Sequence, residues 1–193
     1  MAKHRFDVAC AKPAPWKNGA GSTREIACWP PGAGFDTFDW RVSIASIASS
    51  GPFSTFAGVD RIITLLDGDG VRLQGPGIDH PLDTALQPFA FNGELPIDCA
   101  LLGGESSDFN VMSRRGRVRA DLCVLRGAAE LAVAPAGLLL AVHGQWRADG
   151  ETLASWQGLW WSGEDHAWSL RGTEAGAALL AVAWHPAEAG AAV

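Results

Sequence analysis

The sequence predicts an all-β protein, and three observations support this fold class. Apolar runs of strand length, such as residues 61–66, 138–142 and 178–184, are each followed within two residues by Gly, Asp or Pro. The 23 glycines and 11 prolines are spread evenly between such runs, as turn residues are in sandwiches and barrels. Amphipathic periodicity of about 3.6 residues, which is typical of helices, is hard to find. Only residues 126–134 fit a short strand and a helix equally well.

Composition bounds the size, the partners and the compartment of the protein. The 193 residues, 48% hydrophobic and 19% charged, suffice for one large β domain or two closely packed halves. A net charge of −6 without a long basic cluster argues against nucleic acid as a partner. No segment reaches the ~18 apolar residues that cross a membrane, and the N-terminal residues do not resemble a secretory signal. We therefore expect a cytoplasmic protein without a membrane partner.

A weak internal echo divides the chain into two halves. In the first half, LLDGDG at 65–70 is followed by FNGE at 91–94; in the second, AVHG at 141–144 is followed by WSGE at 161–164. Apolar strands that alternate with glycine turns in this order are typical of a double-stranded β-helix used twice. We expect two barrel halves packed as one structural unit, the second with a Trp-rich core. The expected halves are residues 1–115 and residues 116–193.

The spacing of cysteines and histidines argues against disulfides and metal. The four cysteines show no C-x-x-C pair, so reduced thiols are expected. None of the five histidines belongs to an H-x-H pair, which would place two imidazoles on the same face of a strand. A site assembled from His143, His166 and His185 across strands is the remaining alternative. We predict no metal and no cofactor.

Chemistry-bearing side chains concentrate in the first part of the chain. Residues 15–26, PWKNGAGSTREI, place a cation, an amide and an Arg–Glu pair around two glycines. Glycines let backbone N–H groups approach a ligand closely. Two interpretations stay open, a ligand-binding loop and a hairpin turn in which Lys17 is simply solvated.

Two predicted strands carry further polar residues at alternate positions. In DWRVSIA, Arg41 and Ser43 share one face and Trp40 lies on the other; in DFNVM, Asp108 and Asn110 share a face. Guanidinium groups bind carboxylates bidentately, so an excess of arginine in one cavity suits an anionic ligand. Structural hydrogen bonds among these residues are the alternative.

Five segments, in this order, resemble the HutD/Ves family: PWKNGAGSTREI, WRVSIASIASSGPFSTFAG, RIITLLDGDG, FNGE and DFNVMSRR. The resemblance spans residues 15–115 and departs from the family pattern at Ala20, where glycine is usual. It implies a bicupin, with two cupin barrels in one chain, and a regulatory or metabolite-binding role in histidine utilisation. The matching positions are Trp16, Lys17, Asn18, Gly19, Thr23, Arg24, Glu25, Trp40, Arg41, Ser43, Phe53, Ser54, Arg61, Asp108, Phe109 and Asn110.

Residues and resemblance together predict a metal-free protein whose first half binds a small anionic metabolite similar to urocanate or formylglutamate. We expect Arg41 and Arg61 to clamp carboxylates, and Lys17 and Asn18 to close the mouth of the pocket. The expected ligand-binding residues are Trp16, Lys17, Asn18, Arg24, Trp40, Arg41, Ser43, Phe53, Arg61, Asp108 and Asn110.

Two other functions remain open at this point. A metal-independent isomerase or hydrolase would use Lys17, Glu25 or Asp108 as acid or base. An interaction module would use strand edges or the Trp-rich second half, around Trp160 or Trp161, in a homodimer.

Overall fold

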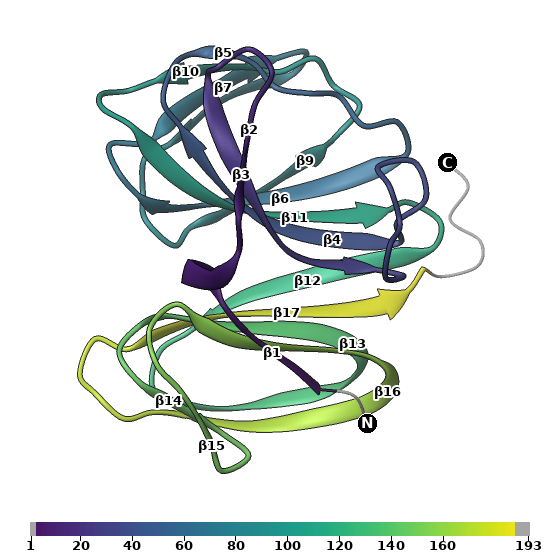
Figure 1. Ribbon diagram of the computed structural model, residues 1–193, viewed down its shortest axis with the longest axis vertical. Helices are drawn as coiled ribbons and strands as arrows, with labels where there is room; N and C mark the ends of the chain where they lie inside the picture. The colour runs from purple at the N-terminus through teal and green to yellow at the C-terminus, as the bar shows by residue number, and fades with distance from the viewer. Residues whose placement is uncertain (1–2, 188–193) are drawn as a thin grey trace. The chain divides into compact units, whose positions relative to one another are not determined.

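The computed structural model describes residues 3–187 and consists of β-strands and one short 3-10 helix, η1 (Val8–Cys10) (Figure 1). The predicted all-β class is confirmed, and the undecided segment 126–134 enters the long strand β13 (Ala128–His143). No helix of the described residues has the length and apolar character of a membrane span. The chain forms two compact units, one of residues 12–117 and one that combines the segment before Lys12 with the chain from Val118 onward.

The first unit contains a six-stranded and a four-stranded sheet, and the paired strands are antiparallel. The order of the larger sheet is β2-β3-β4-β11-β6-β9, and that of the smaller one is β5-β10-β7-β8. The strands of the larger sheet are β2 (Pro13–Pro15), β3 (Gly21–Trp29), β4 (Trp40–Ile47), β11 (Ser106–Arg114), β6 (Val59–Asp67) and β9 (Pro88–Asn92). Those of the smaller sheet are β5 (Gly51–Pro52), β10 (Asp98–Leu101), β7 (Val71–Gly75) and β8 (Ile78–Leu82).

The second unit contains one seven-stranded sheet in the order β12-β17-β13-β16-β14-β15, with β1 as a further partner of β16. Its strands, apart from β13, are β1 (Lys3–Asp7), β12 (Val118–Leu125), β14 (Trp146–Ala148), β15 (Glu151–Leu153), β16 (Gln157–Gly172) and β17 (Ala178–Pro186).

The N-terminal strand differs from the predicted halves. We expected residues 1–115 to form the first half, but β1 pairs with β16 of the second unit, with Lys3 opposite Trp161 and Asp7 opposite Gln157 (Figure 1). A strand partner 150 or more positions away along the chain leaves no local pattern in KHRFD, so the sequence could not reveal it.

The apolar core of the first unit joins its two sheets. Ile47, Ile63 and Leu65 of the larger sheet belong to one buried cluster with Leu73 and Cys99 of the smaller sheet. At about 25 cal/mol per Å² of apolar area removed from water, this cluster is a main source of the unit's stability. We call the face of the larger sheet that carries this cluster its inner face.

The central strands β4 and β11 are buried on both faces. Val42 and Phe109 are 0% exposed on one face, while Arg41 and Asp108 are 8% and 3% exposed on the other. The alternation predicted from the sequence is confirmed, because successive side chains of a strand point to opposite sides. Charged side chains therefore lie on the inner face beside apolar ones.

The core of the second unit is rich in tryptophan, as expected. Trp146, Trp161 and Trp168 pack in one cluster and are each at most 2% exposed. Trp161 is therefore not available for the partner interface that we considered. Trp160 is half-buried, and its ring stacks on His4 with 4.0 Å between ring centroids.

Gly137 in β13 makes room for the ring of Trp161, and this yields a prediction. A Cβ atom at this position would lie 2.2 Å from Cη2 of Trp161 and 2.6 Å from the carbonyl oxygen of Val182. We predict that Gly137→Ala lowers the free energy of unfolding by about 2 kcal/mol or more, because overpacking strains a filled core. Urea titration followed by tryptophan fluorescence measures the change.

The matched control is Gly51→Ala, because a Cβ at Gly51 would meet no atom within 4 Å. Its urea midpoint should stay near that of the unchanged protein. A Gly137→Ala protein as stable as this control would contradict the packing described for Trp161.

Candidate functional site

The inner face of the larger sheet in the first unit gathers polar side chains from three neighbouring strands. In the strand register, Arg41 of β4 and Arg61 of β6 both lie opposite Met112 of β11, and Ser43 lies opposite Asn110, two residues along β11. Asp108 lies a further two residues along β11. Residues directly opposite one another in antiparallel strands, and residues two apart in one strand, point to the same side. The structure thus brings these five side chains together.

The guanidinium group of Arg61 is held by an amide and surrounded by aromatic rings. Arg61 is 7% exposed, and its Nε and Nη2 both donate hydrogen bonds to Oδ1 of Asn110, at 3.2 Å each. The ring centroids of Phe53, Phe56 and Phe91 lie 5.2, 5.7 and 5.0 Å from its Cζ. Cation–π contacts of this kind stabilise a charge that has left water.

Arg61 has no carboxylate ion-pair partner within 4.0 Å among residues 3–187. Burial lowers the pKa of Arg61 to about 10, and the charge of Asp108 opposes this shift. The group therefore stays protonated at neutral pH. A buried charge without a close counterion is costly, and such a group favours any anion that reaches it.

Arg41 is neutralised more completely. Its Nε donates to Oε2 of Glu25 at 2.7 Å, and its Nη1 donates to Oγ of Ser43 at 3.4 Å. The ring of Phe35 lies 5.0 Å from its Cζ. The Glu25 side chain is 54% exposed, whereas that of Arg41 is 9% exposed, so this ion pair lies at the border between the site and solvent.

Asp108 is a buried carboxyl group that titrates near neutrality. Burial raises the pKa of Asp108 to about 7, while the positive charge of Arg61 acts in the opposite direction. Within the described part of the chain, its carboxylate has no hydrogen-bond or ion-pair partner. The carboxylate of Asp108 also acts on Cys99 in the smaller sheet. Burial, and then the charge of Asp108, raise the pKa of this thiol to about 12.

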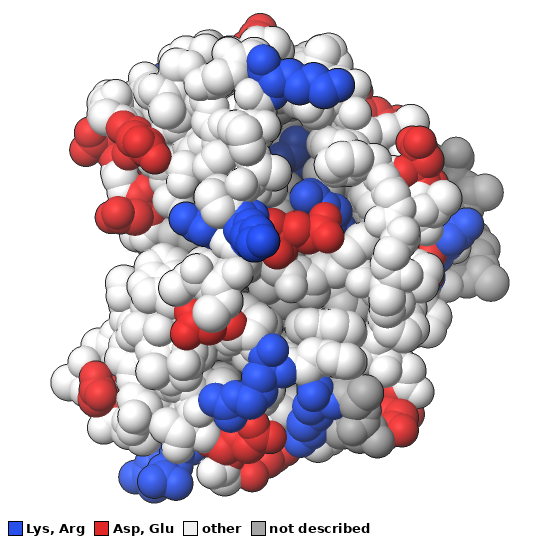
Figure 2. All heavy atoms as spheres, viewed as in Figure 1, with Lys and Arg blue, Asp and Glu red and all other residues white. Residues whose placement is uncertain are grey.

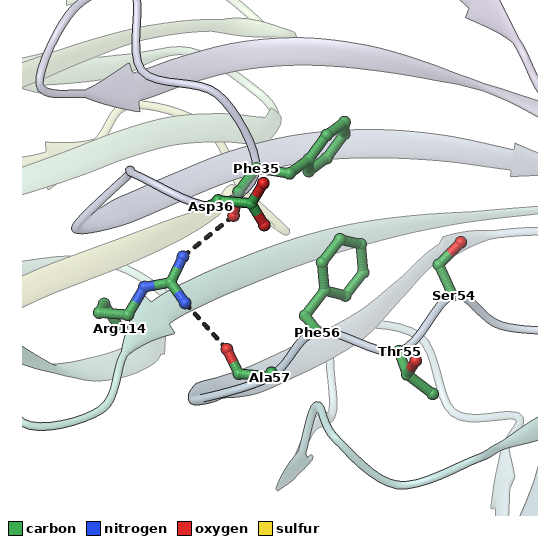
Figure 3. A pocket seen from close by; sticks show the side chains of 7 residues that line it. All are labelled: Phe35, Asp36, Ser54, Thr55, Phe56, Ala57 and Arg114. Atoms are coloured by element: carbon green, nitrogen blue, oxygen red, sulfur yellow. Dashed lines mark hydrogen bonds between the residues drawn. The ribbon is translucent and has the colours of Figure 1, made fainter.

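Two loops meet near the arginine end of these strands (Figure 3). The rings of Phe35 and Phe56, one from each loop, have centroids 5.6 Å apart. The guanidinium group of Arg114 donates to the carbonyl oxygens of Phe35 at 3.0 Å and Ala57 at 2.8 Å, so it ties the two loops together. A depression of about 500 Å³ lies here, lined by Phe35, Asp36, Ser54, Thr55, Phe56, Ala57 and Arg114.

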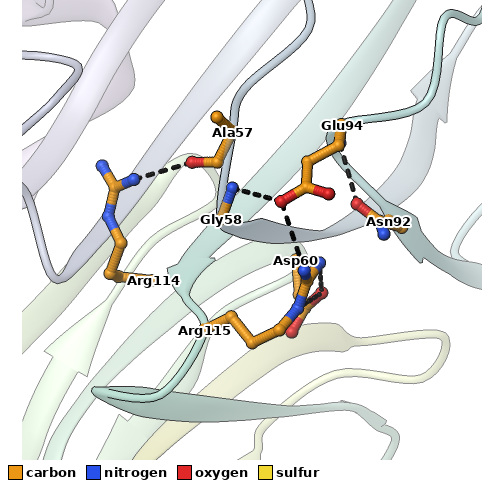
Figure 4. A network of polar contacts seen from close by, with 7 residues as sticks. All are labelled: Ala57, Gly58, Asp60, Asn92, Glu94, Arg114 and Arg115. Atoms are coloured by element: carbon orange, nitrogen blue, oxygen red, sulfur yellow. Dashed lines mark hydrogen bonds and ion pairs between the residues drawn. The ribbon is translucent and has the colours of Figure 1, made fainter.

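A second network anchors the loop around Gly58 (Figure 4). The backbone N–H of Gly58 donates to Oε1 of Glu94, and Arg115 bridges Glu94 and Asp60 at 3.3 and 2.7 Å. The hydrogen bond from Gly58 is the main cause that lowers the pKa of Glu94, which therefore stays ionised. Two family-like segments, FNGE and DFNVMSRR, thus supply residues that hold a loop beside Arg61.

Lys17 and Asn18, which we expected to close the mouth of the site, lie in a turn far from Arg41. Residues 16–20 form the hairpin turn between β2 and β3, in which Oδ1 of Asn18 accepts the N–H of Ala20 at 3.0 Å. Strand β3 then runs from Gly21, opposite Ile47, to Cys28, opposite Arg41. At about 3.3 Å per residue, the turn lies roughly 20 Å from the level of Arg41.

Three other expected ligand-binding residues also lie apart from the arginines. Trp40 occupies the opposite face of β4 from Arg41 and is 1% exposed. Arg24 lies opposite Ile44, which places it on the same side as Trp40. Trp16 packs against the apolar cluster, and its Nε1 donates to Oγ1 of Thr23 at 2.8 Å.

The three histidines of the alternative metal site do not meet. His166 pairs with Asp149 at 2.8 Å, and His185 lies 3.8 Å from Asp121. Residues 3–187 contain no group of three or more His, Cys, Asp or Glu side chains placed to hold a metal ion.

The site contains residues that sequence reasoning missed. Phe35, Phe56 and Phe91 carry no polar atom and gave no chemical signal, although Phe56 and Phe91 stand inside segments that resemble the family. Glu94 stands in the same segment as Phe91, and Arg114 in a further one, but their hydrogen bonds to loop backbone could only come from the fold.

Comparison with known proteins places the chain in a family. Residues 9–180 match the family model described as HutD. "Protein Ves" of Cronobacter sakazakii is 42% identical over 162 residues, which cover 83% of this chain and 88% of that protein. An "uncharacterized 21.2 kDa protein in hutC 3'region" of Pseudomonas putida is 47% identical over 126 residues, 65% of this chain and 66% of that protein.

Solved structures give the same result. The structure of HutD from Pseudomonas fluorescens SBW25 (formate condition) has a TM-score of 0.85 and 33% identity, and the match covers 97% of this chain and 100% of that one. An oxalate decarboxylase mutant of Bacillus subtilis has a TM-score of 0.62 at 8% identity, with 93% and 76% coverage, which is a likeness of fold alone. The fold is cupin-like and all-β, and the chain belongs to the HutD family.

Proposed function

We propose that the first unit binds a small carboxylate-bearing metabolite on the inner face of its larger sheet, without a metal or other cofactor. The observation that carries this proposal is the buried guanidinium of Arg61, whose side-chain hydrogen bonds within residues 3–187 go to the neutral amide of Asn110. A carboxylate ligand would supply the missing counterion.

The electrostatics of the two arginines favour one anionic group. Arg41 is paired with Glu25, whereas Arg61 relies on aromatic rings and a carboxyl group whose pKa is raised. A guanidinium group presents parallel N–H donors that match the two oxygens of a carboxylate. The rings around Arg61 restrict its orientation, which reduces the entropy lost on binding.

Two relatives support histidine utilisation as the biological setting. The Pseudomonas putida relative is named after the hutC region, and the Pseudomonas fluorescens structure is that of HutD in a formate condition. We therefore propose that the protein is a regulator or sensor in this pathway. Its ligand would be similar to urocanate or formylglutamate, both of which carry carboxylates.

The proposal extends to architecture and compartment. We infer that the two units are the two barrel halves of a bicupin and that the first half alone carries this site. The four cysteines are free thiols, which suits the reducing cytoplasm. On the face seen in Figure 2, Lys and Arg side chains lie next to Asp and Glu, which favours a small molecule over nucleic acid as the partner.

Asp108 keeps the enzyme alternative open as a second candidate. Its pKa of about 7 suits a general acid or base at neutral pH. The other two candidates are less suited, because Lys17 is exposed in the distant hairpin turn and Glu25 is engaged by Arg41. Catalysis of an isomerisation or hydrolysis would thus depend on Asp108.

We predict that Arg61→Gln weakens the binding of N-formylglutamate by at least about 30-fold. Each hydrogen bond between charged groups contributes about 1.5–3 kcal/mol, and about 1.4 kcal/mol corresponds to tenfold in affinity. Arg41→Gln should lose less, because Arg41 already has a partner in Glu25. Isothermal titration calorimetry measures both dissociation constants.

The matched control for this experiment is Arg72→Gln, because the Arg72 side chain is 43% exposed and pairs with Asp79 away from the site. Its affinity should equal that of the unchanged protein. If Arg61→Gln binds as tightly as this control, the proposed counterion role of the ligand is wrong.

We also predict that the metal-free protein does not convert urocanate or N-formylglutamate. Proton NMR spectra of either compound should change no faster with the protein than without it. A product that forms with the unchanged protein and not with Asp108→Asn would instead establish the enzyme.

A further inference from the structure

We propose that this site binds its anion together with one proton, which Asp108 takes up, so that binding is coupled to pH. The inference rests on the proposed function and adds its regulation. Asp108 is then the residue that sets the charge of the site, and through it the affinity for the ligand.

Few charged or titratable groups lie close enough to Asp108 to compensate its charge. Leu65 and Ala45 lie directly opposite Asp108, and the arginines Arg61 of β6 and Arg41 of β4 lie on the same face, opposite Met112. The charge of Arg61 reaches Asp108 and acts against the rise of its pKa. From the smaller sheet, Cys99 on β10 contributes a thiol that stays protonated, since its pKa is raised to about 12. Glu25 on β3 is turned to Arg41. The state of Asp108 therefore decides the net charge around Arg61.

The balance of charge follows directly from these groups. With Asp108 ionised, two guanidinium groups are offset by two carboxylates, Glu25 and Asp108, and the cluster is neutral. With Asp108 protonated, one positive charge remains, centred on Arg61. Only this second state matches a single incoming carboxylate without a further unpaired buried charge.

The ligand and Asp108 compete for the same counterion. A carboxylate bound to Arg61 places a second negative charge near Asp108, and like charges raise the pKa of a carboxyl group. The bound state therefore holds the proton more tightly than the free state. By linkage, an anion that raises proton affinity must itself bind more tightly at lower pH.

The protonated carboxyl group also has a role in the complex. It carries one O–H donor, which can donate a hydrogen bond to a ligand oxygen, whereas the ionised form only accepts. Within residues 3–187 no side chain forms a hydrogen bond with the Asp108 carboxyl group, so this donor is not consumed by the protein itself. An asparagine at this position would keep a donor and remove the titration.

The titration of Asp108 should also make the stability of the ligand-free protein depend on pH. Because the folded pKa of Asp108 is raised from 3.8 to about 7, the folded state binds a proton that the unfolded state has lost between these values. Stability is therefore lost as pH rises from about 4 to about 7 and levels off above. Relative to Asp108→Asn, the unfolding equilibrium constant should rise by up to roughly a thousandfold over this window.

Urea titrations of both proteins across this pH range measure the difference. A parallel pH dependence of the two midpoints would show that Asp108 does not titrate there, and would overturn the inference. Asp79→Asn serves as the matched control, because Asp79 is an exposed carboxylate whose pKa is lowered, mainly by its hydrogen bond with Arg72.

Calorimetry of N-formylglutamate binding tests the proton directly. Its carboxyl groups have ordinary acidic pKa values, so a proton taken up near neutrality goes to the protein. At about pH 7.5, titrations in PIPES and in Tris should give heats that differ in proportion to their ionisation enthalpies, with an uptake of roughly 0.5–1 proton. The association constant should fall about fivefold from about pH 7 to 8.

The Asp108→Asn protein should take up no proton and bind with a constant affinity over the same pH range. The buffer comparison on the unchanged protein stands without this variant. Binding without proton uptake would overturn this inference and leave the proposed function intact. No binding at any pH would overturn the proposed function, and the inference with it.

Discussion

The placement of one charge, the buried guanidinium of Arg61, governs the first unit. The sheet holds it on the inner face, next to the apolar cluster, where an ion is costly unless it is paired. Its neighbours are an amide, three aromatic rings and a carboxyl group whose pKa is raised, so none of them neutralises it fully. The folded protein thus contains a buried positive charge that a small anion can neutralise.

The rest of the unit can be understood as support for this arrangement. Strand pairing places Arg41 and Arg61 on either side of Met112 in β11, and Asn110, two residues along the same strand, orients Arg61. The loops near this end are held by side chains that bind backbone groups, Arg114 for two carbonyl oxygens and Glu94 for an N–H group. Groups whose own hydrogen bonds are satisfied in this way hold a site in place before a ligand arrives.

The sequence alone predicted the fold class and which residues share a face of a strand. It did not predict features that depend on the pairing of segments far apart in the chain. Alternation correctly separated Arg41 from Trp40, because the two-residue period of a strand is a local property. The hairpin at Asn18 had two open interpretations, since a ligand loop and a turn use the same residues. The pairing of β1 with β16 and the approach of Phe35 to Phe56 depend on contacts between distant segments, which no local pattern encodes.

A crystal structure of the protein with N-formylglutamate would test the central claim most directly. The account predicts one ligand carboxylate within about 3 Å of the guanidinium of Arg61, on the inner face of the larger sheet. A ligand bound elsewhere, with the Arg61 guanidinium still held by Asn110 alone, would contradict it.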